Sequence, residues 1–337
     1  MFDDGRLDDD QALARADAGM RELAGSGARV RVDAHAAGEA IAALSGAGRD
    51  ERPRAVVAAG PGARLLRAVL EPVCPVPFVA WPGPGLPGWT GSLDLVVVTG
   101  APDGAAAQLA VTDAVRRGCP LILVASAGSP LAELGASRWT TLLPTSTGDV
   151  LATTVVALEA LEALGLAPPV DADEVARTLD DVAVACSPFR DLGSNRAKQV
   201  ATALADATPL LWGGTVLAAR SARRWAEGLR RAAGRPALAA ESSDLAALLE
   251  SSTPRDVFAD PYEDPPADVQ PYLVVLDDGV DAARVRVENG ELVAAAERSG
   301  VRHDRVAALE GGPLARYAGL TLTGQYVAAY VGIGLGR

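Results

Sequence analysis

Two short stretches of the sequence combine residue types that could hold a phosphate group. In the first, Gly60-Pro61-Gly62 follows an apolar run, and a glycine turn from a strand into a helix can present backbone N–H groups to an anion. In the second, Thr145, Ser146 and Thr147 form the densest cluster of hydroxyl groups in the chain, ahead of a predicted helix. Both patterns also have a structural explanation, because tight turns need glycine and helices need caps such as Thr147 or Asp149.

The segments around these stretches predict the secondary structure that must position them. Continuous apolar runs such as 93–99 (LDLVVVT) are typical of strands buried on both faces of a parallel sheet. We expect strands over residues 54–59, 76–80, 93–99, 120–125, 138–143, 209–212, 235–240 and 272–276. We expect helices over residues 1–25, 35–43, 63–70, 149–164, 171–184, 195–205 and 216–229, a short helix that ends at Leu249, and a helical or mixed segment over 281–298. We also expect one helix that Asp103 caps and Arg117 ends, and one or two helices over 311–332.

This alternation of strands and helices predicts an α/β fold with two tandem doubly wound parallel sheets. We place an N-terminal helical segment at residues 1–50, the first α/β domain at 51–166, a linker helix at 167–192, and the second α/β domain with C-terminal helices at 193–337. The polar, proline-rich segment 251–270 is predicted to be a long surface loop.

The composition of the 337-residue chain argues against several classes of function. The formal net charge of −12 disfavours nucleic acids and anionic membranes as partners, because both require a basic face. No apolar run reaches the roughly 18 residues that a membrane span needs. Cys74, Cys119 and Cys186 have no metal-ligand spacing, so we expect reduced thiols in a cytoplasmic protein with no metal and no cofactor.

A further pattern carries a resemblance to a known family. Asn195-x-Ala197-Lys198 precedes an apolar run that ends in Gly213-Gly214. This pattern resembles the beginning of the second sugar isomerase (SIS) domain in the bifunctional phosphoglucose/phosphomannose isomerase family, and the order of elements is similar from about residue 50 onwards. The resemblance implies two SIS-type, flavodoxin-like domains, a sugar phosphate as the small-molecule ligand, and a homodimer whose sites are completed across subunits.

The resemblance also implies where the substrate binds. In the family, phosphate is held in loops rich in glycine, serine and threonine beyond the carboxyl ends of the strands. Ser126 matches a family serine, Thr99 keeps a hydroxyl group, and Arg64 stands at a serine position where, as a fixed cation, it can still bind phosphate. The predicted substrate-binding residues are Gly60, Gly62, Arg64, Thr99, Ser126, Thr145, Ser146 and Thr147.

Catalysis would require groups that the family pattern does not supply here. Aldose–ketose isomerisation needs a base, usually a carboxylate, and a group that opens the sugar ring. The positions that match the family's base are Arg230, Arg231 and Ala232. The family's C-terminal lysine has no counterpart, because Lys198 is the only lysine in the chain. Glu227 is a conceivable substitute base, and we take Glu241 and His303 as the catalytic candidates.

Two functions from different classes therefore stay open. The first is an active isomerase that converts fructose 6-phosphate to glucose 6-phosphate or mannose 6-phosphate through relocated residues. The second is a catalytically inactive SIS-fold protein that binds a sugar phosphate as a regulator or scaffold. The absence of several separate catalytic groups favours little or no isomerase activity. A nucleotide-binding enzyme would rest on Gly60-x-Gly62 alone.

Overall fold

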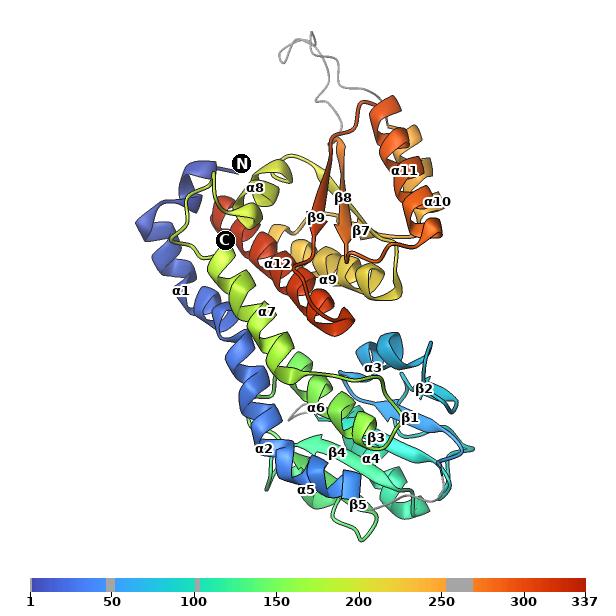
Figure 1. Cartoon of the computed structure of the whole chain (residues 1–337). Helices are drawn as coiled ribbons and strands as arrows, with labels where there is room; N and C mark the ends of the chain where they lie inside the picture. Colours follow the sequence, from blue (N-terminus) through green and yellow to red (C-terminus); the bar gives the residue numbers. More distant parts are fainter. Residues whose placement is uncertain (1, 47–51, 101–103, 253–268) are drawn as a thin grey trace. The chain divides into compact units, whose positions relative to one another are not determined.

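The computed structural model describes residues 2–46, 52–100, 104–252 and 269–337. The chain forms two compact units, Ser26–Ala176 (the first-sheet unit) and Met1–Gly25 together with Arg177–Arg337 (the second-sheet unit). Each unit contains one parallel sheet with helices on both faces, which confirms the predicted α/β fold (Figure 1). The predicted helix cap Asp103 and most of the predicted loop 251–270 lie outside the described residues.

The sheet of the first-sheet unit has the strand order β2-β1-β3-β4-β5, and all of its strand pairs are parallel. This order is the flavodoxin-like one, whose direction reverses between β1 and β3. The strands are β1 (Val56–Ala59), β2 (Phe78–Ala80), β3 (Leu95–Thr99), β4 (Leu121–Ala125) and β5 (Thr140–Pro144). Every residue of β1, β3 and β4 is buried, as continuous apolar runs require.

Helices cover both faces of this sheet. On one face α4 and α5 pack on β1, β3 and β4, and on the other α3 and α6 lie together, with α2 against α6 and β5. The helices are α2 (Ser26–Gly46), α3 (Ala63–Leu70), α4 (Ala105–Arg117), α5 (Pro130–Leu134) and α6 (Val150–Ala163). Helix α7 (Ala172–Ala185) contains the boundary between the two units.

The sheet of the second-sheet unit repeats the same winding with one strand fewer. Its order is β7-β6-β8-β9, again parallel throughout, so its direction reverses between β6 and β8. The strands are β6 (Thr208–Gly213), β7 (Leu238–Ala239), β8 (Pro271–Asp277) and β9 (His303–Ala307).

The helices of the second-sheet unit also divide between two faces. Helices α10 and α11 lie side by side on one face (Figure 1), while α9 packs on β6 and β8 and is covered by α12. The elements are η1 (Asp4–Leu7), α1 (Asp10–Ala24), α8 (Arg196–Ala203), α9 (Val216–Ala233), α10 (Ser242–Glu250), α11 (Ala283–Arg298) and α12 (Pro313–Gly334).

Three local predictions need correction. Helix α2 begins at Ser26 rather than near residue 35, because its many alanines favour a helix without giving a strong amphipathic pattern. Strand β9 is absent from the predicted elements, since it is a charged edge strand in which Val306 alone is buried. The N-cap residue of α4 is Gly104, one position after the predicted Asp103.

The pattern Asn195-x-Ala197-Lys198 organises the packing at the start of α8. The Asn195 side chain caps α8 by accepting from the N–H groups of Ala197 and Lys198, at 3.0 and 3.1 Å. Lys198 is fully buried, and its Nζ donates to Asp8 Oδ1 at 2.6 Å and to the carbonyl oxygens of Pro188 and Arg190. These bonds compensate the buried ammonium and fix the N-terminal segment onto α8.

The C-terminal helix α12 is part of the core of its unit. Its Tyr330 hydroxyl donates to the Cys186 carbonyl at 2.6 Å, and its Leu320 carbonyl accepts from Trp225 Nε1 on α9 at 2.7 Å. The apolar side chains of α12 are therefore buried inside the unit. Across the described ranges, no helix combines the length and the apolar character that crossing a membrane would require.

The contact between α9 and α12 predicts a large cost for adding one methyl group. A Cβ at Gly324 would overlap the Trp225 ring, which is fully buried. We expect Gly324→Ala to lower the unfolding free energy by about 1–3 kcal/mol, as overpacking does. The control is Gly19→Ala on α1, where no atom lies within 4 Å of a new Cβ and where helix propensity predicts a gain of up to about 1 kcal/mol. Equal urea midpoints for the two variants would contradict this packing.

Candidate functional site

The predicted glycine turn and Thr99 meet at the carboxyl edge of the first sheet, where its strand order reverses. The Thr99 hydroxyl accepts a hydrogen bond from the Gly62 N–H at 3.0 Å. Gly60 has a φ of +93°, and a Cβ at this position would overlap the Thr99 carbonyl oxygen. Both glycines are therefore needed for the close approach of the two strand ends. The close approach of the two strand ends places the start of α3 at the carboxyl edge of the sheet, where flavodoxin-like folds bind ligands.

Two helices begin at this edge without a capping side chain among the described residues. Gly62 is the N-cap residue of α3 and Gly104 that of α4, and neither provides a side-chain acceptor for the first N–H groups of its helix. The first residues of α4, Ala105 and Ala106, are exposed, and so is Arg64 in the first turn of α3. At α3 the Gly62 N–H already donates to the Thr99 hydroxyl and the Ala63 N–H to the Gly60 carbonyl, so α3 offers an anion the exposed Arg64 side chain. The exposed start of α4 favours an anion directly.

Ser126 lies at the same edge, directly after β4. It is exposed, and its carbonyl oxygen accepts from the Ser129 N–H at 3.1 Å. Ser129 caps α5 by accepting from the Ala132 N–H. The loop is therefore held by its own hydrogen bonds, and the Ser126 hydroxyl is left at the surface.

A carboxylate of the protein holds part of the loop after β5 that carries the hydroxyl cluster. Asp33 on α2 is fully buried and accepts from the N–H groups of Ser146 and Thr147, at 2.8 and 3.2 Å, and from the Thr147 hydroxyl at 2.5 Å. Thr145 is buried, and Asp149 caps α6. Asp33 thus takes both N–H groups and the Thr147 hydroxyl, whereas Ser146 is exposed.

The catalytic candidates lie apart. Glu241 follows β7 at the carboxyl edge of the second sheet; its side chain is 76% exposed and lies 3.9 Å from Arg223. His303 is the first residue of β9 and pairs with Leu273 near the start of β8, so it lies at the amino edge. Within one unit the structure does not bring these two side chains together. Glu227 lies on α9, paired with Arg224 at 2.7 Å.

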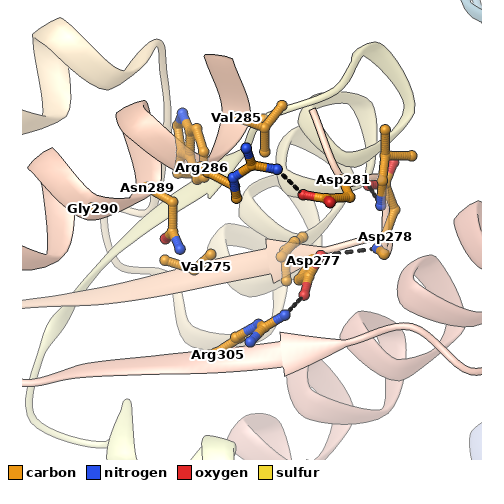
Figure 2. A pocket seen from close by; sticks show the side chains of 14 residues that line it. Val275, Asp277, Asp278, Asp281, Val285, Arg286, Asn289, Gly290 and Arg305 are labelled. Carbon is orange, nitrogen blue, oxygen red and sulfur yellow. Dashed lines mark hydrogen bonds and ion pairs between the residues drawn. The ribbon is translucent and has the colours of Figure 1, made fainter. Parts of the chain in front are cut away.

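A pocket that the sequence-based predictions did not include opens at the carboxyl edge of the second sheet. It has a volume of about 450 Å³ and lies where the strand order reverses between β6 and β8, with α11 as one wall (Figure 2). Its polar lining comes from Asp277, Asp278, Asp281, Arg286, Asn289 and Arg305. Two consecutive carboxylates directly after the predicted strand 272–276 were the signal in the sequence that could have located it.

The two aspartates after β8 have different partners. Asp277 pairs with Arg305 on β9 and accepts from the Gly279 N–H at 2.8 Å. Asp278 is buried and accepts from the Thr215 hydroxyl at the start of α9. Asp278 thus ties the ends of β6 and β8 together, whereas the Asp277–Arg305 pair stands on the pocket wall (Figure 2).

A second pocket, of about 580 Å³, lies on the first-sheet unit between α2, α6 and residues 170–173. Burial raises the pKa of Glu159 in this pocket to about 7, although the Ala172 N–H donates to it; the carboxylates of Glu162, Asp171 and Asp173 raise the pKa further. The four carboxyl groups of this pocket would repel a phosphate. In the parts of the chain that the structure describes, no group of three or more His, Cys, Asp or Glu side chains could hold a metal ion.

Comparison with known families and structures agrees with this architecture. Residues 193–337 match the family model described as the bacterial phospho-glucose isomerase C-terminal SIS domain. The comparison with curated protein sequences gave no significant match.

Solved structures resemble the chain over nearly its whole length. A glucose-6-phosphate isomerase like protein from Thermus thermophilus has a TM-score of 0.52 at 16% identity, covering 98% of this chain and 93% of its own. Tagatose-6-phosphate ketose/aldose isomerase from Escherichia coli has a TM-score of 0.61 at 14% identity, with coverages of 94% and 93%. The C-terminal domain of glucosamine-fructose-6-phosphate aminotransferase from Francisella tularensis has a TM-score of 0.57 at 12% identity, with coverages of 90% and 95%. Because the sequence identities are 16% or lower, these structural similarities establish the fold alone.

The contacts of Asp33 predict that it stabilises the loop after β5. Asp33→Ala removes three hydrogen bonds and leaves the N–H groups of Ser146 and Thr147 without their acceptor. We expect the unfolding free energy to fall by roughly 2–4 kcal/mol, measured by chemical denaturation. The exposed Asp206 provides the control, since Asp206→Ala should change stability by less than about 0.5 kcal/mol. A loss below about 1 kcal/mol for Asp33→Ala would mean that the loop does not depend on this carboxylate.

The raised pKa of Glu159 predicts a pH dependence of stability. The pKa of Glu159 is about 7 in the folded chain, whereas in the unfolded chain it has its ordinary value of 4.5. Between pH 4.5 and about 7, folding is therefore coupled to the uptake of a proton by Glu159. The stabilisation by the protonated carboxyl group is complete below pH 4.5 and is lost as the pH rises through 7. Relative to Glu159→Gln, the wild type should lose stability over this window in urea titrations. Parallel curves for the two proteins would contradict the assignment.

Proposed function

We propose that this chain, a SIS-domain protein whose residues 193–337 match the bacterial phospho-glucose isomerase C-terminal SIS domain, binds a sugar phosphate and has little or no isomerase activity. The phosphate would lie at the carboxyl edge of the first sheet. The observation that carries this proposal is the exposed start of α4, which has no capping side chain among the described residues and lies at the same edge as Arg64 of α3. Arg64 supplies the cation, and the glycines of the turn allow the close approach.

The choice of ligand follows from the family and from the chemistry of the edge. An anion is favoured at the first turn of α4 and by the Arg64 side chain, and the exposed Ser126 hydroxyl can donate to a sugar or phosphate oxygen. Thr147 contributes less than the sequence suggests, because Asp33 already holds its N–H and hydroxyl groups, and Thr145 is buried, whereas the exposed Ser146 can still contact a ligand. A hexose phosphate such as fructose 6-phosphate is the first ligand to test.

Weak or absent catalysis follows from the positions of the candidate groups. Glu241 and His303 lie at opposite edges of one sheet, so within one unit they cannot act on the same sugar carbon pair. Lys198 cannot open a sugar ring either, because its ammonium group is fully buried against Asp8. The relocated base of an active isomerase would therefore have to be Glu241 alone, which is exposed at the carboxyl edge.

We also propose that the protein works as a homodimer in the cytoplasm. The family resemblance supports the dimer, and the three cysteines, none of which is in a disulfide, are consistent with a reducing compartment. A molar mass from light scattering twice that of the chain is expected. A monomer at micromolar concentration would overturn this part of the proposal.

The proposal predicts binding without turnover. Fructose 6-phosphate at about one hundred times its Kd should add about 2.7 kcal/mol of stability and raise the melting temperature. A coupled assay should detect neither glucose 6-phosphate nor mannose 6-phosphate above background. Arg64→Leu should weaken binding roughly tenfold or more, since a charge-assisted hydrogen bond is lost.

The control for this prediction is Arg67→Leu on the same helix, which removes an exposed arginine paired with Glu71 and should leave binding unchanged. Turnover that disappears in Glu241→Gln would establish a relocated base and overturn the non-catalytic part of the proposal. Absence of both turnover and thermal shift would overturn sugar-phosphate binding itself.

A further inference from the structure

The pocket of the second-sheet unit takes no part in the proposed phosphate site. It lies at the carboxyl ends of β6 and β8, at the point where the strand order reverses, which is where open parallel sheets bind ligands. Its volume of about 450 Å³ is of the size of small-molecule sites. All of its lining residues belong to one unit, so the site is complete within that unit.

The charges that line the pocket disfavour an anion. Asp277, Asp278 and Asp281 face two guanidinium groups, those of Arg286 and Arg305, which leaves one excess negative charge. Both arginines are already engaged, Arg286 with Asp281 and Arg305 with Asp277 (Figure 2). A phosphate would have to compete with these carboxylates and would meet their repulsion, whereas a neutral ligand would not.

Asn289 supplies a polar group that lacks a partner. Its Oδ1 is buried and accepts no hydrogen bond from any described residue. The side chain extends from α11 toward Val275 on β8, inside the pocket (Figure 2). A buried polar atom without a partner costs free energy, which a ligand group could recover. A hydroxyl group fits either orientation of the amide, because it both donates and accepts.

The remaining walls provide an apolar surface next to these polar groups. Trp212, Val275 and Val285 line the pocket beside Asn289. An apolar surface flanked by a carboxylate–guanidinium pair and an amide matches a sugar ring, which carries C–H groups on its faces and hydroxyl groups around its rim.

We propose that this pocket binds the uncharged, hydroxyl-bearing ring of a sugar, with Asn289 and the Asp277–Arg305 pair contacting its hydroxyl groups. Asp277 accepts from one or two hydroxyl groups, Arg305 donates to their oxygen atoms, and Asn289 completes the contacts from α11. The ring packs on the apolar surface. This site is distinct from the proposed phosphate site, because it lies in the other unit and selects for hydroxyl groups rather than for an anion.

The test is a binding measurement on the full chain with free D-glucose, D-mannose, D-fructose and inorganic phosphate as separate probes. We expect at least one hexose to bind with a roughly millimolar Kd, measured by saturation-transfer NMR and calorimetry. Asn289→Leu should weaken this binding about tenfold without lowering the melting temperature, because it replaces an unpaired buried amide by an apolar group of similar size.

A second variant keeps the test independent of folding. Arg305 is 67% exposed on an edge strand, so Arg305→Leu should fold normally and also weaken hexose binding. The matched controls are Arg298→Leu, which removes an exposed arginine paired with Glu250, and Gln325→Leu, which removes an exposed amide on α12. Neither should change hexose binding.

Two results would overturn the proposal. One is that no free hexose binds, or that binding is the same in Asn289→Leu and Arg305→Leu as in the controls. The other is that these two variants weaken the binding of inorganic phosphate, which would make the pocket an anion site. The phosphate site proposed at the first sheet is tested separately, because it predicts that Arg64→Leu weakens the binding of fructose 6-phosphate.

Discussion

The N-terminal segment of the second-sheet unit is held by one ion pair, that between the fully buried Lys198 and the half-exposed Asp8. Burying an ammonium group costs several kcal/mol unless charge and hydrogen bonds compensate it, and here a carboxylate and two carbonyl oxygens do so. The Tyr330 ring lies 5.5 Å from Nζ, and its hydroxyl group contacts Asn195. The pattern that carries the family resemblance is therefore a structural one. Its presence therefore reports on the fold and does not depend on the chemistry of the family.

The loops at the strand ends also contain residues that hold the structure together and residues that could bind a ligand. In the first sheet, Gly60, Gly62 and Thr99 are required by the close approach of β1 and β3, and Thr99 takes the Gly62 N–H at the start of α3, whereas the start of α4 is exposed. After β5 the carboxylate of Asp33 holds the N–H groups instead. Binding and capping use identical donors, so whether a loop binds a ligand depends on whether the protein provides its own acceptor.

Much of the fold could be predicted, because it rests on local signals. Buried runs such as 93–99, alternating with helical segments, were sufficient for two parallel sheets. The site was predictable only in part. The role of Asp33 comes from a residue more than one hundred positions from the loop that it holds, and no local pattern reveals such a contact. The strand that begins at His303 could not be predicted, because a charged edge strand lacks the apolar run that marks a buried one.

A sugar-phosphate site without isomerase chemistry, as proposed for this chain, would bind fructose 6-phosphate without exchanging its protons. The most direct measurement is NMR of fructose 6-phosphate with the protein in D₂O, since an isomerase that abstracts the C1 proton exchanges it with solvent even when no net product accumulates. We expect a protein-dependent broadening of the ³¹P signal, which reports binding, and no incorporation of deuterium at C1. Deuterium at C1 that depends on the protein and is lost in Glu241→Gln would overturn the proposed absence of isomerase chemistry.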